Sequence, residues 1–212
     1  MRLCKMGYVC PPFFGNINSY TVNQLDHKQV SEEMTLEEYK ETVRKLAELK
    51  SPTVFHNPTD SHASFVLTQI MESSKKVVRV YDNILGDLTD SDPEFLSAIR
   101  NSIERKIKVK YVYDEVKKES ALYKMLDDFR ANSEFCDCVD LRVSSDSFNQ
   151  SISHVYGENL RFTLGDKRMY RIQPQPAGNV PVRKGICSFN GVDMVENLAL
   201  CFDNHFEELA VG

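Results

Sequence analysis

The stretch Asn159-Leu-Arg-Phe-Thr-Leu-Gly-Asp166 decides the fold that this sequence predicts. Apolar runs at 160–164 and 169–172 flank the segment Gly165-Asp-Lys-Arg168. Two short apolar runs that are joined by a glycine-containing turn predict a β-hairpin. The stretch also places three polar side chains in the order N-x-R-x-x-x-x-D, with the arginine on the first strand and the aspartate in the turn.

Strand and helix patterns alternate through the sequence before this hairpin. Apolar, β-branched runs predict strands at 54–55, 77–81, 107–113 and 139–143. Apolar residues at helical spacing predict helices that begin near residues 62, 93 and 119. Alternating strands and helices favour parallel pairing with right-handed crossovers. The sequence therefore predicts a mixed α/β fold with a largely parallel sheet flanked by helices.

The segments on either side of this pattern differ in character. Residues 1–34 are rich in turn-forming residues and predict an irregular arm. A helix is expected from Thr35, where Glu38 completes a capping box, to the residues before Pro52. We therefore divide the chain into an arm plus helix (1–53) and an α/β domain (54–212). Within that domain we also expect a polar loop at 144–153, a Pro/Gly-rich loop at 173–185, a strand at 186–189 and a helix at 191–208.

Composition narrows the class of protein. The chain has 212 residues, a formal net charge of −5 and a pI near 5.6, which argues against a nucleic-acid binder whose whole surface is basic. No apolar run approaches the length of a membrane span, and the first residues lack the apolar core of a signal peptide. We therefore expect a cytoplasmic protein with reduced thiols, of which Cys187 and Cys201 lie among apolar neighbours. The Cys136-x-Cys138 spacing is too tight for a zinc knuckle, so neither a metal nor a cofactor is expected.

The N-x-R-x-x-x-x-D spacing resembles the H-x-K-x-x-x-x-D signature of the phospholipase D superfamily. Asparagine stands in place of the histidine and arginine in place of the lysine. The order of elements from about residue 54 to residue 209 is similar to one phospholipase D-like half. Ser188-Phe-Asn190 also resembles the downstream Ser-x-Asn element of that family.

The resemblance implies a reaction whose catalytic residues are only partly present in this chain. In the family, a histidine attacks phosphorus, a second histidine from another copy of the motif protonates the leaving group, and lysines stabilise the charge. Asn159 would occupy the nucleophile position without a usable lone pair. Arg161 would still hold phosphate and Asp166 would still orient its neighbours. A chain with a single copy of the motif would have to form a homodimer to pair two copies.

Basic residues are concentrated around the signature. Residues 159–184 contain six lysines and arginines and one aspartate, a local excess of +5. One interpretation is an anion site; the other is a solvated hairpin whose arginines pair with nearby carboxylates. The candidate ligand-binding residues are Asn159, Arg161, Asp166, Lys167, Arg168, Arg171, Ser188 and Asn190. His154, five residues before Asn159, is the candidate for a displaced nucleophile.

Three functions are compatible with these observations. The first is a non-catalytic phospholipase D-like domain that binds an anionic ligand, phosphate or nucleic acid, or a protein partner. The second is an active phosphodiesterase or nuclease that uses His154 or a site shared across a dimer. The third is an assembly protein of a larger complex, in which the arm and first helix dock on a partner. The missing histidine favours the first.

Overall fold

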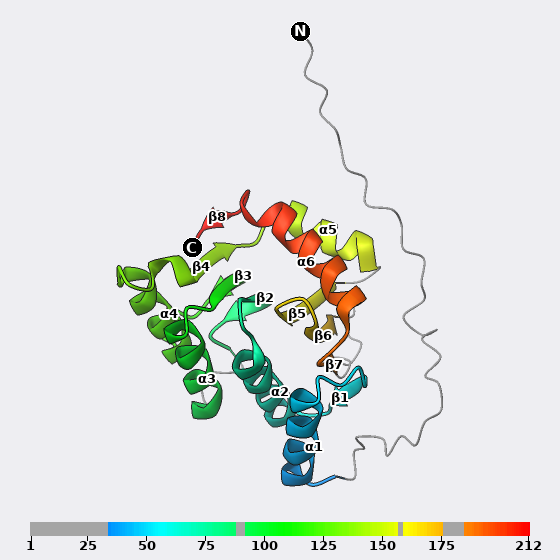
Figure 1. Ribbon diagram of the computed structural model, residues 1–212. Coiled ribbons are helices and arrows are strands. Elements are labelled where there is room, and N and C mark those ends of the chain that lie inside the picture. Colours follow the sequence, from blue (N-terminus) through cyan, green and yellow to red (C-terminus); the bar gives the residue numbers. More distant parts are fainter. Residues whose placement is uncertain (1–33, 88–91, 157–158, 176–184) are drawn as a thin grey trace.

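The protein is described by a computed structural model over residues 34–87, 92–156, 159–175 and 185–212, so the predicted arm lies almost wholly outside the described residues. The described part forms one eight-stranded sheet flanked by α-helices (Figure 1). The strands are β1 (Phe55–Asn57), β2 (Val77–Leu85), β3 (Lys108–Val116), β4 (Val139–Val143), β5 (Asn159–Gly165), β6 (Met169–Gln175), β7 (Gly185–Ser188) and β8 (Ala210–Val211). The helices are α1 (Leu36–Glu48), α2 (Asp60–Ser73), α3 (Pro93–Glu104), α4 (Ala121–Ala131), α5 (Asp146–Tyr156), α6 (Val192–Phe206) and the short 3-10 helix η2 (Cys136–Cys138).

The sheet is mixed, with the strand order β1-β7-β6-β5-β2-β3-β4-β8. Among the described strands, β2 pairs with β3 and β3 with β4 in parallel, and the other neighbouring pairs are antiparallel. The predicted mixed α/β sheet is confirmed, but the expectation of a largely parallel sheet needs correction. Parallel neighbours require a crossover, which α3 and α4 supply here, whereas the tight turn between β5 and β6 reverses the chain and makes that pair antiparallel.

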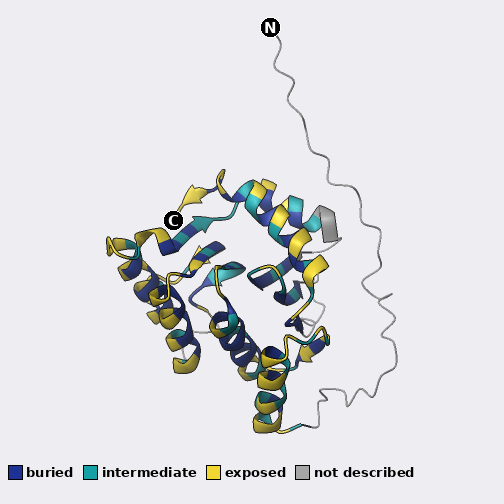
Figure 2. Ribbon diagram, viewed as in Figure 1, coloured by how far each residue is buried: buried dark blue, intermediate teal, exposed yellow. Residues whose placement is uncertain are grey.

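The sheet separates two layers of helices (Figure 1). Helices α1 to α4 cover one face, and α5 and α6 cover the other. Alternation along β2 shows how the strand serves both layers, because Val80 joins the core under α2 to α4 and Tyr81 joins the core under α5 and α6. Buried residues accordingly follow the sheet and the inner sides of the helices (Figure 2). None of the helices in the described segments has the length and apolar character that crossing a bilayer needs.

Local signals in the sequence set the helix starts. The Thr35 hydroxyl accepts from Glu38 N at 3.3 Å and the Glu38 carboxylate accepts from Thr35 N at 2.9 Å, so the predicted capping box is present. Asp92 Oδ1 accepts from Glu94 N at 2.9 Å, and Pro93 occupies the first turn of α3. Cys187 and Cys201 are buried, as predicted.

The predicted polar loop at 144–153 is wrong, because most of this segment is helix α5. Phe148 and Ile152, one helical turn apart, are both fully buried against the sheet. The Ser145 hydroxyl accepts from Phe148 N at 3.2 Å at the start of the helix. The Ser151 hydroxyl, in turn, donates to the Ser147 carbonyl at 2.8 Å. Ser145 therefore caps the helix, Ser147 lies on its exposed side, and Phe148 and Ile152 form the buried stripe among its described side chains.

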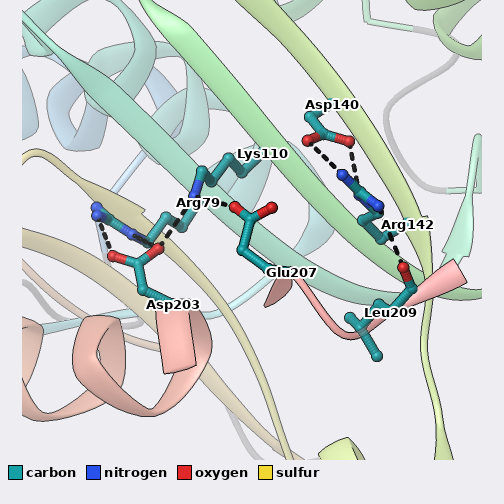
Figure 3. A network of polar contacts seen from close by, with 7 residues as sticks. All are labelled: Arg79, Lys110, Asp140, Arg142, Asp203, Glu207 and Leu209. Carbon is teal, nitrogen blue, oxygen red and sulfur yellow. Dashed lines mark hydrogen bonds and ion pairs between the residues drawn. The ribbon is translucent and has the colours of Figure 1, made fainter. Parts of the chain in front are cut away.

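A network of charges holds the end of α6 against the sheet (Figure 3). Arg79 of β2 donates to both carboxylate oxygens of Asp203, at 3.0 and 2.5 Å, and Lys110 Nζ of β3 lies 3.5 Å from the same group. On β4, Arg142 binds Asp140 and donates to the Leu209 carbonyl at 3.2 Å. The C-terminal part of α6 is therefore tied to three neighbouring strands by side chains that no local sequence pattern connects.

Asp203 makes this attachment dependent on pH. Burial by itself raises the pKa of Asp203, but the hydrogen bonds and charges of Arg79 and Lys110 outweigh burial and hold the pKa below its usual value. A carboxyl whose pKa is lowered by folding contributes stability above its unfolded pKa of about 3.9 and loses it as the pH falls through the folded pKa.

We therefore expect Asp203→Asn to lower the free energy of unfolding at pH 7 by about 1 kcal/mol, because the pair is partly screened by solvent. The difference from the wild type should shrink as the pH falls below about 4, where the unfolded wild-type chain binds a proton at this residue before the native carboxylate does, and it should be smallest once the native carboxylate is also protonated. Urea denaturation at pH 7, 5 and 3 measures this. Asp137→Asn, at an exposed position, is the control. A difference between Asp203→Asn and the wild type that is the same at all three pH values would contradict the assignment.

Candidate anion site

Arg161 is a buried cation at the point where β5 passes the end of β2. Its neighbour Phe162 pairs with Tyr81, and the Arg161 side chain is 11% exposed. Nη2 donates to Asp114 Oδ2 at 2.7 Å, and the guanidinium carbon lies 4.3 Å from the centre of the Tyr81 ring. One carboxylate from β3 and one aromatic face from β2 therefore fix the arginine that stands in the signature strand.

The partners of Arg161 are held in turn by α5 and the segment before it. The Ser144 hydroxyl donates to Asp114 Oδ1, and Asn149 Nδ2 lies 3.5 Å from the same oxygen. The Tyr81 hydroxyl donates to Asn149 Oδ1. Burial raises the pKa of Tyr81 to about 12 despite the charge of Arg161, so the phenol stays protonated and serves as a donor.

Two side-chain nitrogens of Arg161 take no part in these contacts. Nε and Nη1 are buried and have no hydrogen-bond partner among the described residues. Leaving a buried donor unsatisfied costs about 1–3 kcal/mol, and more for a charged group. An anionic oxygen would satisfy either nitrogen with a charge-assisted hydrogen bond. The site therefore has donor capacity that its described neighbours do not use.

A second buried arginine lies beside the first. Arg171 of β6 donates from Nε to Asn57 Oδ1 at 3.2 Å and from Nη2 to Gln173 Oε1 at 2.7 Å. Burial raises the pKa of Asp82, at the end of β2, although the charges of Arg171 and Arg161 oppose the rise. The two arginines thus lie near two aspartates, Asp82 and Asp114, and burial favours the uncharged form of Asp82.

Asp166 lies at the opposite end of β5. Its carboxylate accepts from the backbone N–H groups of Lys75, Lys76 and Val77 at 2.9, 2.8 and 3.2 Å. Asp166 N donates to the Val77 carbonyl at 2.8 Å, and the residue has a positive φ of 52°. The aspartate of the signature therefore joins the hairpin turn to the start of β2 and does not touch Arg161.

A hollow of about 210 Å³ lies away from both groups of residues, between α3 and α4. It is lined by Arg100, Met125, Asp128, Phe129 and Asn132. The lining contains one cation, one carboxylate, one amide and apolar groups, and it does not include Asn159, Arg161 or Asp166. We therefore take the charged group around Arg161 as the candidate site.

Comparison with known proteins rests on structure. Neither a protein-family model nor a curated protein matches the sequence. NucT from Helicobacter pylori matches with a TM-score of 0.50 at 10% identity, over 76% of this chain and 98% of that one. Nuc from Salmonella typhimurium, a phospholipase D family member, has a TM-score of 0.48 at 14% identity, over 76% of this chain and 96% of that one. TrmBL2, an archaeal chromatin protein, has a TM-score of 0.49 at 14% identity over 84% of this chain, which spans 64% of TrmBL2.

The fold is phospholipase D-like. This confirms the predicted fold, and at 10% identity the likeness to NucT concerns the fold alone. Identities of 10–14% carry no residue roles across, so the degenerate motif has to be judged from the geometry of this chain. The stretch from Asn159 to Gly165 forms β5, which pairs with the first of the three parallel strands, and Asp166 follows it in the turn.

The structure distributes the predicted ligand-binding residues over two places. Arg161 and Arg171 belong to the charged group at the ends of β2 and β3. Five others lie near the β5–β6 turn and the end of β7, where Arg168 Nη1 donates to the Phe189 carbonyl at 2.6 Å: Asp166, Lys167, Arg168, Ser188 and Asn190. The backbones of His154 and Asn159 lie in α5 and at the start of β5, but their side chains are outside the described residues, as are Arg183 and Lys184. The predicted basic segment is therefore not one patch, and the ligand role of each residue stays a prediction.

Sequence reasoning missed the residues that surround Arg161. Asp114 directly follows the predicted strand 107–113, and ligand sites in open α/β sheets gather beyond the carboxyl ends of parallel strands. Applied to the predicted strands 77–81 and 107–113, that rule points to Asp82 and Asp114, which directly follow them. Asn149 and Ser144 were hidden in the segment taken for a loop.

We expect Asp166→Ala to lower the free energy of unfolding by about 2 kcal/mol or more, since three backbone donors lose a charged acceptor and alanine is strained at positive φ. Asp166→Asn should cost less, because asparagine tolerates this φ and keeps one acceptor oxygen. Chemical denaturation of both variants, with the exposed Asp137→Ala as control, measures the effect. Equal stability of Asp166→Ala and the wild type would show that the backbone donors find other partners.

Proposed function

We propose that this chain is a phospholipase D-like domain that binds a phosphate-bearing anion at Arg161 without hydrolysing it. The observation that carries the proposal is the pair of buried Arg161 nitrogens, Nε and Nη1, that have no partner among the described residues. The third nitrogen already binds Asp114 at 2.7 Å, which orients the guanidinium from one side. A phosphate, free or in a nucleic acid, supplies the oxygens that the remaining nitrogens lack.

The groups around Arg161 support binding over hydrolysis. Asparagine occupies the nucleophile position of the signature, and among the described side chains no histidine contacts Arg161. The nearby phenol of Tyr81 has a raised pKa. Burial also raises the pKa of the Cys187 thiol to about 12, so that it stays protonated at neutral pH. None of these groups is an activated nucleophile.

Asp114 sets the strength of binding in this proposal. Its carboxylate neutralises Arg161 and would repel an arriving phosphate, so ligand and carboxylate compete for the same cation. The expected affinity is therefore modest in the wild type and rises when the competitor loses its charge.

We expect Arg161→Gln to weaken the binding of inorganic phosphate by about 10- to 100-fold, which is the worth of one or two charge-assisted hydrogen bonds. Asp114→Asn should strengthen it by about tenfold, or about 1.4 kcal/mol. Calorimetric or NMR titration with phosphate at fixed ionic strength measures both changes. Asp140→Asn is the matched control, because Asp140 pairs with Arg142, at 2.8 Å, outside the site.

Opposite effects of the two substitutions would distinguish a ligand site from a structural ion pair. If both variants only lower the melting temperature and phosphate binds neither them nor the wild type, the Arg161–Asp114 pair serves packing. That result would favour the assembly protein, whose partner-binding surfaces lie elsewhere.

The non-catalytic assignment makes a separate prediction. Wild-type protein and His154→Ala should both leave a chromogenic phosphodiester intact over hours, at concentrations where a homodimer would form, because the signature lacks its nucleophile. Release of the chromophore by the wild type and its loss in His154→Ala would establish the phosphodiesterase. Activity that depends on protein concentration would point to a site shared between two copies.

A further inference from the structure

Cations gather at the end of the sheet opposite Arg161. This surface, the basic end, consists of Lys75, Lys76, Lys108, Lys167 and Arg168. Backbone hydrogen bonds bring the segments together, since Lys108 N donates to the Lys76 carbonyl at 3.0 Å and the N–H groups of Lys75 and Lys76 donate to Asp166. Lys167 and Arg168 directly follow that aspartate. Three neighbouring strands, β5, β2 and β3, thus contribute to one surface.

The lysines of the basic end are exposed, and no described carboxylate forms an ion pair with them. Asp166 supplies the nearby negative charge, but its two oxygens accept three backbone hydrogen bonds. Elsewhere on the protein, exposed lysines such as Lys45 and Lys106 pair with Glu41 and Glu134 at 2.7 and 3.1 Å. In a chain with a net charge of −5, a group of unpaired cations concentrates positive potential in one place.

The composition of the surface selects among anionic partners. The exposed large hydrophobic residues of the described part are Leu49, Val54, Val192, Leu200 and Val211, and none belongs to the segments of the basic end. Binding to a membrane surface usually combines cations with apolar side chains that enter the bilayer. A surface of flexible lysines without apolar groups suits a phosphate backbone in water.

The spacing of the segments also fits a phosphate backbone. Neighbouring strands are about 4.8 Å apart, so the ends of three strands extend over roughly 10 Å. One strand of duplex DNA carries a phosphate about every 3.4 Å along the axis, so this width covers roughly three phosphates. We propose that the basic end binds the phosphate backbone of double-stranded nucleic acid without reading its sequence.

Asp166 is a positioning residue in this proposal. By binding the backbone of Lys75 and Lys76, it holds the start of β2 against the turn that carries Lys167 and Arg168. The signature aspartate thus organises a surface at the far end of β5 from the signature arginine.

The test compares two double substitutions that change the net charge equally. Lys76→Glu/Lys167→Glu alters the basic end, and Lys118→Glu/Lys124→Glu alters exposed lysines elsewhere. Fluorescence anisotropy with a labelled 20-base-pair duplex is measured from 50 to 200 mM salt. With three phosphates contacted, the wild-type log K should fall with log salt with a slope of about −2.7. The basic-end variant should bind at least tenfold more weakly at 50 mM salt, with a slope shallower by about 1.8.

Three outcomes would overturn the proposal: no binding of duplex by the wild type, equal weakening by both double variants, or binding of phosphatidylserine vesicles in place of duplex. If circular dichroism shows that the glutamate variant does not fold, Lys76→Gln/Lys167→Gln replaces it, with Lys118→Gln/Lys124→Gln as control. Inorganic phosphate binding by the Lys76→Glu/Lys167→Glu variant is measured as well, and it should match that of the wild type, because both lysines lie at the end of the sheet opposite Arg161. Failure here is therefore distinguishable from failure of the phosphate site at Arg161.

Discussion

Three backbone N–H groups that converge on the carboxylate of Asp166 join the two halves of this fold. Residues 75–77 begin the parallel half of the sheet, and Asp166 forms the turn of the antiparallel half. Gly165 is required beside it, because a Cβ there would lie 2.6 Å from the Met169 side chain and 2.8 Å from Ser74 Oγ. The register of β5 on β2, and with it the position of Arg161 beside Tyr81, depends on this junction.

A group of buried charged side chains lies around Arg161 at the other end of β5. Arg161 binds Asp114, Arg171 binds the amide oxygens of Asn57 and Gln173, and Asp82, whose pKa burial raises, lies near both arginines. Such a group is stable only if nearly every donor is satisfied, which makes the free nitrogens of Arg161 conspicuous among the described residues. In the proposed function an anion would complete this network, and no described group beside Arg161 is activated for attack on it.

Much of the architecture was predictable from the sequence because it rests on local patterns. The capping box at Thr35, the proline after Asp92 and the hairpin around Gly165 each place an element where the structure has it. Helix α5 was missed because only two of its described side chains, Phe148 and Ile152, are buried and apolar, and several of its other positions carry serine or asparagine. The partners of Arg161 were missed because Asp114 lies 47 positions away along the chain. Their proximity follows from sheet order, which a single sequence does not specify.

The two outermost strands of the sheet have a consequence for the behaviour of the protein in solution. β1 has three residues and β8 has two, so each edge offers few unpaired backbone groups to another chain. Short edge strands are a common protection against edge-to-edge pairing between sheets. Where β8 covers β4, the longer parallel strands are shielded from growth of the sheet by addition of foreign strands. We therefore expect these two edges, as described, to add foreign strands less readily than long edge strands would.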